Sequence, residues 1–460
     1  MLYSAAHTAS VAGWQTALFG ALLLGLIACL ALEEKIHAKK SLIAGSFAVV
    51  CLLLAALMDL LPFGPVVNAF GEEMALPVYI PAVDWSVIAI ILGSSIFVDV
   101  TSQSGLFTWI AIKLTRRSGG DPLILLWFYG LMTVVFSAVL NNVTAMIIVG
   151  SLSVVSLERL GRRNLLLGFL LIEGLLTNVG GLLTLISSVP NIIVGTAAGI
   201  SFGQFLLVAA PYVVVATIIT MVMGARRFEI RRLAPEEQAQ AAELVDSFDE
   251  NDGIHSQGFF IFGALMTGLF ILTIASASVL PGIRDLGMGF VALAFAAIML
   301  WRFKHEVDRF YRTVDWDLLG FFVALFIVIN TMEHAQVLHV IGGGIQKVIG
   351  LGDTLGSGAM LVSAAVASSV TDNIPLAAML AKILGQLGTA TDSSLWWAVI
   401  FGANLGGNIT PIGSASTLVA MTLIHKNKLN LSFAGFVTVA APFAAVQITL
   451  AIAYVLAFLT

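Results

Sequence analysis

Long apolar runs recur along the whole chain, and they restrict its fold more than any other feature. Of the 460 residues, 59% are hydrophobic and 11% are charged, whereas a soluble domain carries roughly 25% charged residues. Many runs reach the ~20 residues that a helix needs to cross a bilayer. Lipid offers no hydrogen-bond partner to a bare backbone amide, so such crossings must be helical. The sequence therefore predicts an all-α polytopic membrane protein.

The apolar runs predict ten full crossings and two re-entrant hairpins. The hairpins, at 122–157 and 357–388, are expected to enter and leave on the same side. No Lys or Arg precedes the first run, which favours a retained span over a cleaved secretory signal. The crossings are expected at 12–32, 41–62, 83–112, 164–198, 203–223, 257–280, 286–301, 316–341, 395–424 and 432–459.

Basic residues gather in alternate loops and predict the orientation. Lys39 and Lys40 follow the first crossing, and Arg226 and Arg227 open the central loop, whereas the segment 63–82 has no base. The positive-inside rule places the basic loops in the cytoplasm and both termini outside. We expect a multi-pass protein of the bacterial inner (plasma) membrane.

The two halves of the chain repeat each other. The tripeptide Val-Asp-Trp occurs at 83–85 and again at 314–316, and further polar motifs recur in the same order at nearly the same spacing. Asp84 is predicted outside and Asp315 lies beside a cytoplasmic loop, so the repeats are inverted. Inverted repeats are typical of secondary transporters that work by alternating access. The expected division is an N-terminal span (1–40), a first repeat (41–223), a cytoplasmic linker (224–256), a connecting span (257–280) and a second repeat (286–460).

Each repeat is expected to contain one interrupted transmembrane helix. In the first, Gly180, Gly181 and Pro190 weaken a continuous helix. A break leaves free amides that favour an anion and free carbonyls that favour a cation. The alternative is that the small residues only allow close helix packing. The candidate substrate- or ion-binding residues here are Asn178, Gly180, Gly181, Thr184, Ser187, Ser188, Asn191, Asn404, Gly406, Gly407, Asn408, Thr410 and Ser414, with candidate sodium sites at the Asn178 and Asn404 motifs.

The hairpins carry polar residues near their centres. Asn141, Asn142 and Thr144 lie in the first hairpin, and Asp372 and Asn373 lie in the second. Such residues inside apolar hairpins need partners, and they are candidates for one shared binding site. The alternative is that their side chains only cap the hairpin tips.

Four carboxylates in the apolar runs are candidates for proton coupling, because intramembrane charges are costly and usually functional. Glu333 has His334 beside it, a combination that could titrate together or lie solvated at the end of its span. Lys382 could neutralise an anionic substrate, reach the membrane interface or pair with a carboxylate. The four carboxylates are Asp99, Glu173, Glu333 and Asp372.

These motifs resemble the ion transporter superfamily, and most closely its branch of arsenite-efflux proteins, NhaD-type sodium/proton antiporters and the melanosomal P protein, with a citrate-transporter-like domain. The resemblance spans residues 40–459 and implies a two-hairpin fold and a homodimer with a scaffold part and a moving transport part. The branch usually has Asp where Asn141 stands and Gly-Asp-Pro-Pro-Asn at 187–191, so two acidic positions are neutral here. The segments that carry the resemblance are 140–144, 177–181, 190–191, 372–375 and 402–408.

The sequence thus predicts a secondary active transporter, with two functions left open. A sodium (cation)/proton antiporter is slightly favoured. The alternative is a sodium- or proton-coupled transporter of a small anion or oxyacid, of the dicarboxylate/citrate or arsenite type. Motifs of an intramembrane protease or a nucleotide-binding loop do not occur, so we expect no enzyme and no cofactor beyond a bound sodium ion. The expected partners are membrane lipid, an inorganic ion or small molecule and a second copy of the chain, with no nucleic acid.

Overall fold

Helices dominate the computed structural model, which describes residues 11–67, 71–246, 249–251, 253–254 and 256–460. The sheet within these ranges is one short ribbon, in which β1 (Val66–Val67) pairs antiparallel with β2 (Glu73–Met74). Ten of the described helices are long and apolar enough to cross a membrane. The all-α polytopic membrane fold predicted from the apolar runs is therefore confirmed.

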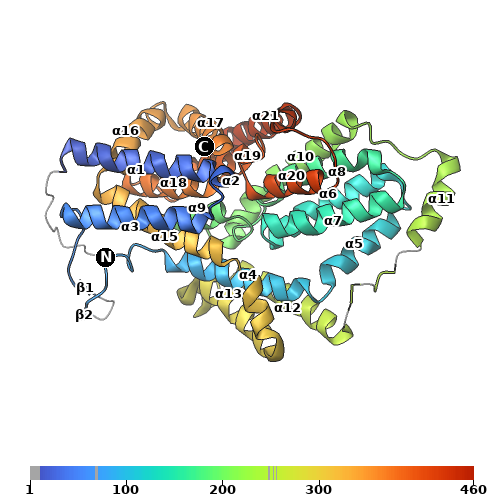
Figure 1. The fold of residues 1–460 in the computed structure, drawn as a ribbon, viewed down its shortest axis with the longest axis horizontal. Coiled ribbons are helices and arrows are strands. Elements are labelled where there is room, and N and C mark those ends of the chain that lie inside the picture. Colours follow the sequence, from blue (N-terminus) through green and yellow to red (C-terminus); the bar gives the residue numbers. More distant parts are fainter. Residues whose placement is uncertain (1–10, 68–70, 247–248, 252, 255) are drawn as a thin grey trace.

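The first half of the chain runs from α1 to α10 (Figure 1, blue to green). Its elements are α1 (Gly13–Ala31), α2 (Glu33–Ile36), α3 (Lys40–Leu57), α4 (Trp85–Ser102), α5 (Leu106–Arg117), α6 (Pro122–Val139), α7 (Asn142–Arg159), the short 3-10 helix η1 (Arg163–Leu165), α8 (Leu166–Gly180), α9 (Val189–Ala197) and α10 (Phe202–Arg227).

A polar segment that contains α11 (Pro235–Asp246) leads to the second half, which ends in α21 (Figure 1, yellow to red). Its elements are α12 (Gln257–Ser276), α13 (Ile283–Arg302), η2 (Lys304–Glu306), α14 (Val307–Thr313), α15 (Trp316–His334), α16 (Val337–Ile349), α17 (Asp353–Val370), α18 (Asn373–Gln386), α19 (Ser394–Gly406), α20 (Ala415–Lys426) and α21 (Phe433–Phe458).

The two halves have the same succession of elements. A hairpin (α6–α7 or α17–α18) is followed by an interrupted helix (α8–α9 or α19–α20) and then by a long helix with an internal proline (α10 or α21). The halves also exchange partners, because α3 packs against α15 while α13 packs against α4. Each half therefore completes the other, as expected of inverted repeats.

Single hydrogen bonds recur between the repeats. Ser137 Oγ of the first hairpin donates to the carbonyl of Thr177 at 2.6 Å, and Ser368 Oγ of the second donates to that of Ala403 at 2.6 Å. The Trp side chains of the two Val-Asp-Trp motifs each donate to the carbonyl five residues earlier, at 3.1 and 2.9 Å. Equal contacts at equivalent positions mean that the sequence repeat is also a structural one.

Besides the two interrupted helices, two further predicted crossings are divided in the structure. The 83–112 run is α4 followed by α5, and the 316–341 run is α15 followed by α16. In both cases one residue in the left-handed region turns the chain, Gly105 (φ 84°) or Gln336 (φ 64°). A Cβ on Gly105 would lie 2.1 Å from the carbonyl oxygen of Gly253, so the central linker packs on this turn. Because the residues on both sides are apolar, the hydropathy of the sequence does not indicate these breaks.

Close contact with the hairpins depends on glycines in the interrupted helices. A Cβ on Gly180 would lie 2.7 Å from the Cα of Val134, and a Cβ on Gly406 would lie 2.3 Å from the carbonyl oxygen of Ala365. Both distances are far below van der Waals contact, so α8 and α19 touch the backbones of α6 and α17. These glycines therefore serve close packing, the alternative that the sequence left open for them.

We predict that Gly406→Ala destabilises the protein by about 1–3 kcal/mol, the usual range for overpacking a tight interior. The measurement is thermal unfolding of the detergent-solubilised protein followed by tryptophan fluorescence. Gly343→Ala on α16 is the matched control, because a Cβ there meets no atom within 4 Å. Equal unfolding temperatures for the two variants would contradict the close packing.

Candidate substrate cavity

The hairpin tips place polar side chains at the starts of α7 and α18. Asn141 caps α7 by accepting a hydrogen bond from the amide of Thr144 at 2.7 Å. Asp372 caps α18 by accepting one from the amide of Ile374 at 3.0 Å. Capping of this kind favours helix initiation directly after the tip. The tip-capping interpretation thus applies to both residues, in addition to the further contacts that they make.

The break between α8 and α9 is stabilised by side chains of the same segment. Ser187 Oγ donates to the carbonyls of Gly181 and Thr184, at 2.6 and 2.7 Å. Asn191 Nδ2 donates to the same two carbonyls, at 2.6 and 3.0 Å. These carbonyls would otherwise be left without partners in an apolar interior, which is costly.

Threonines attach the interrupted helices to the hairpins. Thr184 Oγ1 donates to the carbonyl of Ala138 at 2.5 Å, and Thr410 Oγ1 donates to that of Ser369 at 2.6 Å. The two contacts are equivalent in the two repeats. Each hairpin and the adjoining interrupted helix are therefore joined by hydrogen bonds as well as by packing.

Four buried asparagines join the two repeats, and we call them the asparagine cluster: Asn178, Asn191, Asn404 and Asn408. Asn178 Nδ2 donates to Asn408 Oδ1 at 2.8 Å, and Asn404 Nδ2 donates to Asn191 Oδ1 at 2.9 Å. All four side chains are fully buried. The two candidate sodium motifs are thus brought together at the contact between the repeats.

Serines complete the hydrogen bonding of the asparagine cluster. Ser188 Oγ donates to Asn404 Oδ1 at 2.8 Å, and the equivalent Ser414 Oγ accepts from Asn178 Nδ2 at 2.9 Å. Ser416 Oγ donates to Asn178 Oδ1 at 3.1 Å. The side-chain oxygens of Asn178 and Asn404 therefore already accept hydrogen bonds from the protein.

The asparagine cluster also reaches the two long proline-containing helices. Asn408 Nδ2 donates to the carbonyl of Leu175 at 3.1 Å and to Gln447 Oε1 on α21 at 2.8 Å. Gln447 Nε2 in turn donates to Thr220 Oγ1 on α10 at 2.9 Å. Satisfied polar networks of this kind fix one arrangement of the helices around them.

A cavity of about 740 Å³ lies beside the asparagine cluster. Asn178, Ser187 and Ser188 form its buried part, and His37 and Asp315, which are exposed, line its outer part. The outer residues belong to the segment after α1 and to the start of α15. Both adjoin loops with several basic residues, so the cavity opens toward the side that the sequence predicts to be cytoplasmic.

The N-termini of four helices line this cavity, those of α7, α9, α18 and α20. Their first residues are Asn142, Val189, Asn373 and Ala415. The cap residue of α9, Ser188, makes no side-chain hydrogen bond to the helix amides. Helix N-termini present backbone amides and the positive end of the helix dipole. The cavity is therefore favourable for negative charge at its inner end.

Charged side chains surround the outer part of the cavity. Lys40 forms a salt bridge with Asp372 at the tip of the second hairpin and lies 3.8 Å from Glu33. Asp317 accepts hydrogen bonds from the hydroxyl and the amide of Ser41, the residue after Lys40. Helix α3 and the second hairpin are thus held together by charge beside the cavity.

The cavity brings together about half of the residues expected to bind substrate or ion. Asp372 lies beside it through Lys40 and Asn373. The expected residues that line it are Asn141, Asn142, Thr144, Asn178, Ser187, Ser188, Asn373 and Ser414. The expected residues that do not line it are Gly180, Gly181, Thr184, Asn191, Asn404, Gly406, Gly407, Asn408 and Thr410.

The other candidate proton-coupling carboxylates occupy three different environments. Asp99 lines the cavity from α4. Glu333 forms a salt bridge with Lys382 at 2.8 Å, the pairing left open for that lysine. Glu173 lies outside the cavity lining, fully buried in α8. The four carboxylates therefore do not form one cluster.

The basic residues of the cavity are not among the site residues that the sequence motifs predict. In the sequence, Lys39 and Lys40 indicate only the orientation of the chain, and no motif contains Glu33 or His37, although all four residues line the cavity. These residues precede or open α3, far in sequence from both hairpins. The available signal was a charged segment directly before an apolar helix, which reads equally well as a membrane-flanking loop.

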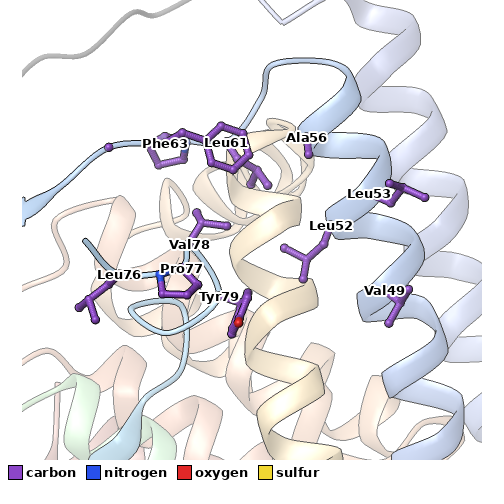
Figure 2. Close-up of a pocket in the computed structure, with 12 residues that line it drawn as sticks. Val49, Leu52, Leu53, Ala56, Leu61, Phe63, Leu76, Pro77, Val78 and Tyr79 are labelled. Carbon is purple, nitrogen blue, oxygen red and sulfur yellow. The ribbon is translucent and has the colours of Figure 1, made fainter. Parts of the chain in front are cut away.

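A second pocket, of about 480 Å³, differs in character from the cavity. Figure 2 shows Leu52, Phe63 and Tyr79 among the side chains around it, contributed by α3 and by the segments after it. Its lining contains no acidic or basic side chain among the described residues. It is therefore a mainly apolar groove.

Solved structures of the same fold are transporters. The YdaH transporter of Alcanivorax borkumensis superimposes with a TM-score of 0.60, at 13% identity, covering 91% of this chain and 98% of that one. MtrF of Neisseria gonorrhoeae gives a TM-score of 0.57 at 15% identity, covering 92% and 95%. At such low identity these likenesses show the fold alone.

Sequence relatives include uncharacterized transporters. An uncharacterized transporter of Mycobacterium tuberculosis is 28% identical over 377 residues, which cover 81% of this chain and 86% of the relative. The human P protein is 23% identical over 507 residues, covering 92% of this chain and 60% of its own length. The sequence pattern of the citrate transporter family matches residues 30–402. Because this match covers most of the chain, the protein belongs to the citrate transporter family and is a secondary transporter.

Proposed function

We propose that this protein is a cation-coupled transporter of a small organic anion that carries carboxylate groups. The observation that carries the proposal is the meeting of four helix N-termini at one cavity. Backbone amides at helix N-termini bind carboxylates and phosphates without a dedicated basic residue. This is the second of the two functions that the sequence left open.

The size of the cavity supports a molecular substrate. Its volume of about 740 Å³ falls within the roughly 300–1,000 Å³ of small-molecule sites. A metal ion with its inner ligands occupies only a small part of such a volume. A di- or tricarboxylate would fill it better, and the family to which the chain belongs is described as citrate transporters.

The lining can accept both an anion and a coupling cation. The side-chain amide of Asn142 lies at the start of α7, beside the helix N-termini where an anion would bind. Glu33, Asp99 and Asp317 also line the cavity and carry carboxylate oxygens that could bind a cation. Sodium or a proton at these carboxylates would offset the charge of the organic anion.

Sodium/proton antiport is the second candidate, and the charge of the cavity supports it. Among its lining residues the side chains of Glu33, Asp99, Asp315 and Asp317 outnumber those of Lys39 and Lys40. A surplus of carboxylates attracts cations and allows protons to compete with them. In this alternative the Asp372 carboxylate is the exchange site.

The wider organisation is part of the same proposal. We assign α1 and α12, which pack on α3 and α13, to equivalent places beside the two repeats. The hairpins and interrupted helices would form the moving transport part, and α3, α4, α13 and α15 the scaffold of a homodimer in the inner membrane. Alternating access would then carry the cavity from one side of the membrane to the other.

We predict that the purified protein in liposomes exchanges radiolabelled citrate and accumulates it under an imposed sodium or proton gradient. A pH dye trapped in the same liposomes distinguishes the two candidates. Proton movement on adding sodium in the absence of any organic anion would favour antiport. Without citrate exchange, and with other di- and tricarboxylates also inactive, the proposal of an organic anion would be wrong.

We predict that Asp372→Asn abolishes cation-coupled transport while the protein remains folded. Asparagine still caps α18, because its side-chain oxygen accepts the amide hydrogen bond, but it cannot neutralise Lys40. The measurement is uptake into liposomes, with size-exclusion chromatography as the folding check.

Asp84→Asn is the matched control for that variant. Asp84 caps α4 in the same way, accepting hydrogen bonds from the amides of Ser86 and Val87, and it does not line the cavity. We expect wild-type uptake from it. Full coupled transport by Asp372→Asn would remove Asp372 from the mechanism.

A further inference from the structure

A buried carboxyl group lies on α8, away from the cavity. Glu173 is fully buried, and Ser153 Oγ on α7 donates a hydrogen bond to its Oε1. Its Oε2 has no hydrogen-bond partner, and no other carboxyl oxygen among the described residues is both buried and unpaired. A charged carboxylate with one unsolvated oxygen is very costly in an apolar interior.

Several buried hydroxyl groups lie near this carboxyl group, and each of them has a hydrogen-bond partner. The hydroxyl of Tyr129 on α6 lies 2.7 Å from Ser156 Oγ and 2.5 Å from Thr115 Oγ1. Thr115 Oγ1 donates onward to the carbonyl of Ala111 at 2.9 Å. Ser156 is one turn from Ser153 on α7, so a row of buried hydroxyls leads from Glu173 to the end of α5.

The helices that pack around Glu173 place few titratable side chains near it. Tyr129 on α6 interacts with it electrostatically, and Tyr212 on α10 donates its hydroxyl to the carbonyl of Gln447 at 3.0 Å. Helix α19 has no titratable residue. The remaining titratable residues of the packed elements lie at helix ends: Glu158 and Arg159 on α7, Arg163 in η1, Arg226 and Arg227 on α10, and His425 and Lys426 on α20.

The second repeat shows that the fold does not need this polar group. The positions equivalent to Tyr129, Ser153 and Glu173 are the buried apolar residues Met360, Leu384 and Val399. The hairpins of the two repeats are related by an offset of 231 residues, since Ser137 corresponds to Ser368, and the interrupted helices by 226, since Asn178 corresponds to Asn404. The first offset applies to Tyr129 and Ser153, and the second to Glu173. The same packing is thus achieved with apolar side chains, at no cost of burying a carboxyl group.

We propose that Glu173 is a proton-binding site of the transport cycle, separate from the substrate cavity. In the conformation described here it is the neutral acid, with its proton on the carboxyl group. When the group loses that proton, the O–H bond breaks, the proton passes to water and a carboxylate remains. The carboxylate does not fit the present packing around α8, so proton release requires the helices around it to rearrange. Proton binding and conformation are thereby linked.

This proposal deepens the proposed function by locating its coupling proton, and its first test does not depend on transport. We expect the infrared spectrum of the full-length protein in lipid at neutral pH to contain the carbonyl stretching band of a protonated carboxylic acid. Glu173→Gln should remove it. Glu158→Gln is the control, because Glu158 is exposed and lies 3.8 Å from Arg163, and the band should remain. An unchanged band in Glu173→Gln would overturn the proposal.

The second test asks whether the proton drives transport, with radiolabelled citrate as the probe. A glutamine mimics the neutral acid permanently, so Glu173→Gln should still exchange citrate across the liposome membrane. Accumulation of citrate driven by a proton gradient should fall to the level of empty liposomes. Unchanged accumulation, or equal loss of exchange and accumulation, would assign the residue a structural role and overturn the proposal.

Glu173→Val keeps the test decisive if the glutamine variant does not fold. Valine is the residue at the equivalent position of the second repeat, where it is fully buried. We expect a monodisperse protein with the same loss of proton-driven accumulation and with exchange retained. Absence of citrate exchange in the wild-type protein would contradict the proposed function alone, because the infrared band still decides the proton site.

Discussion

The fold depends on the requirement that every backbone polar group in an apolar interior find a partner. The interrupted helices violate this requirement locally, because each break leaves amides and carbonyls outside the helical hydrogen-bond pattern. Ser187 and Asn191 accommodate the carbonyls of the first break. The amides at the start of α9 receive no such side chain from Ser188. At the first break the structure thus stabilises the carbonyl end internally and leaves the amide end of α9 beside the cavity.

Inverted symmetry explains why the site lies between the halves. Ser188 and Ser414 are equivalent, and each bonds to the asparagine of the opposite repeat. The contact that Ser188 makes across the repeats therefore recurs at Ser414, and both contacts involve the asparagine cluster. A polar residue that lacks an equivalent in the other repeat is an exception to this symmetry and needs a separate explanation. Glu173 has no polar equivalent in the second repeat, so its role does not follow from the symmetric scaffold.

The sequence was sufficient to predict the helical class, the inverted repeats, the hairpins and the interrupted helices, because these depend on apolar runs and on glycine, proline and polar motifs with a local effect. The left-handed turn at Gln336 was missed, since its flanks are as apolar as a continuous span. Lys40 was not expected at the cavity, because its salt bridge with Asp372 joins residues 332 positions apart. Which asparagines would line the cavity and which would bond only to the protein also depends on tertiary packing.

The salt bridge between Lys40 and Asp372 also bears on how the carrier senses the membrane potential. If the second hairpin moves while α3 stays in place, the negative charge of Asp372 crosses part of the electric field and the positive charge of Lys40 does not. Moving one elementary charge through the full potential corresponds to about 2.3 kcal/mol per 100 mV. An empty carrier would thus do electrical work when it reorients, and a carrier with a cation on that carboxylate would not. The membrane potential would then affect the reorientation of the empty carrier but not that of the cation-bound carrier.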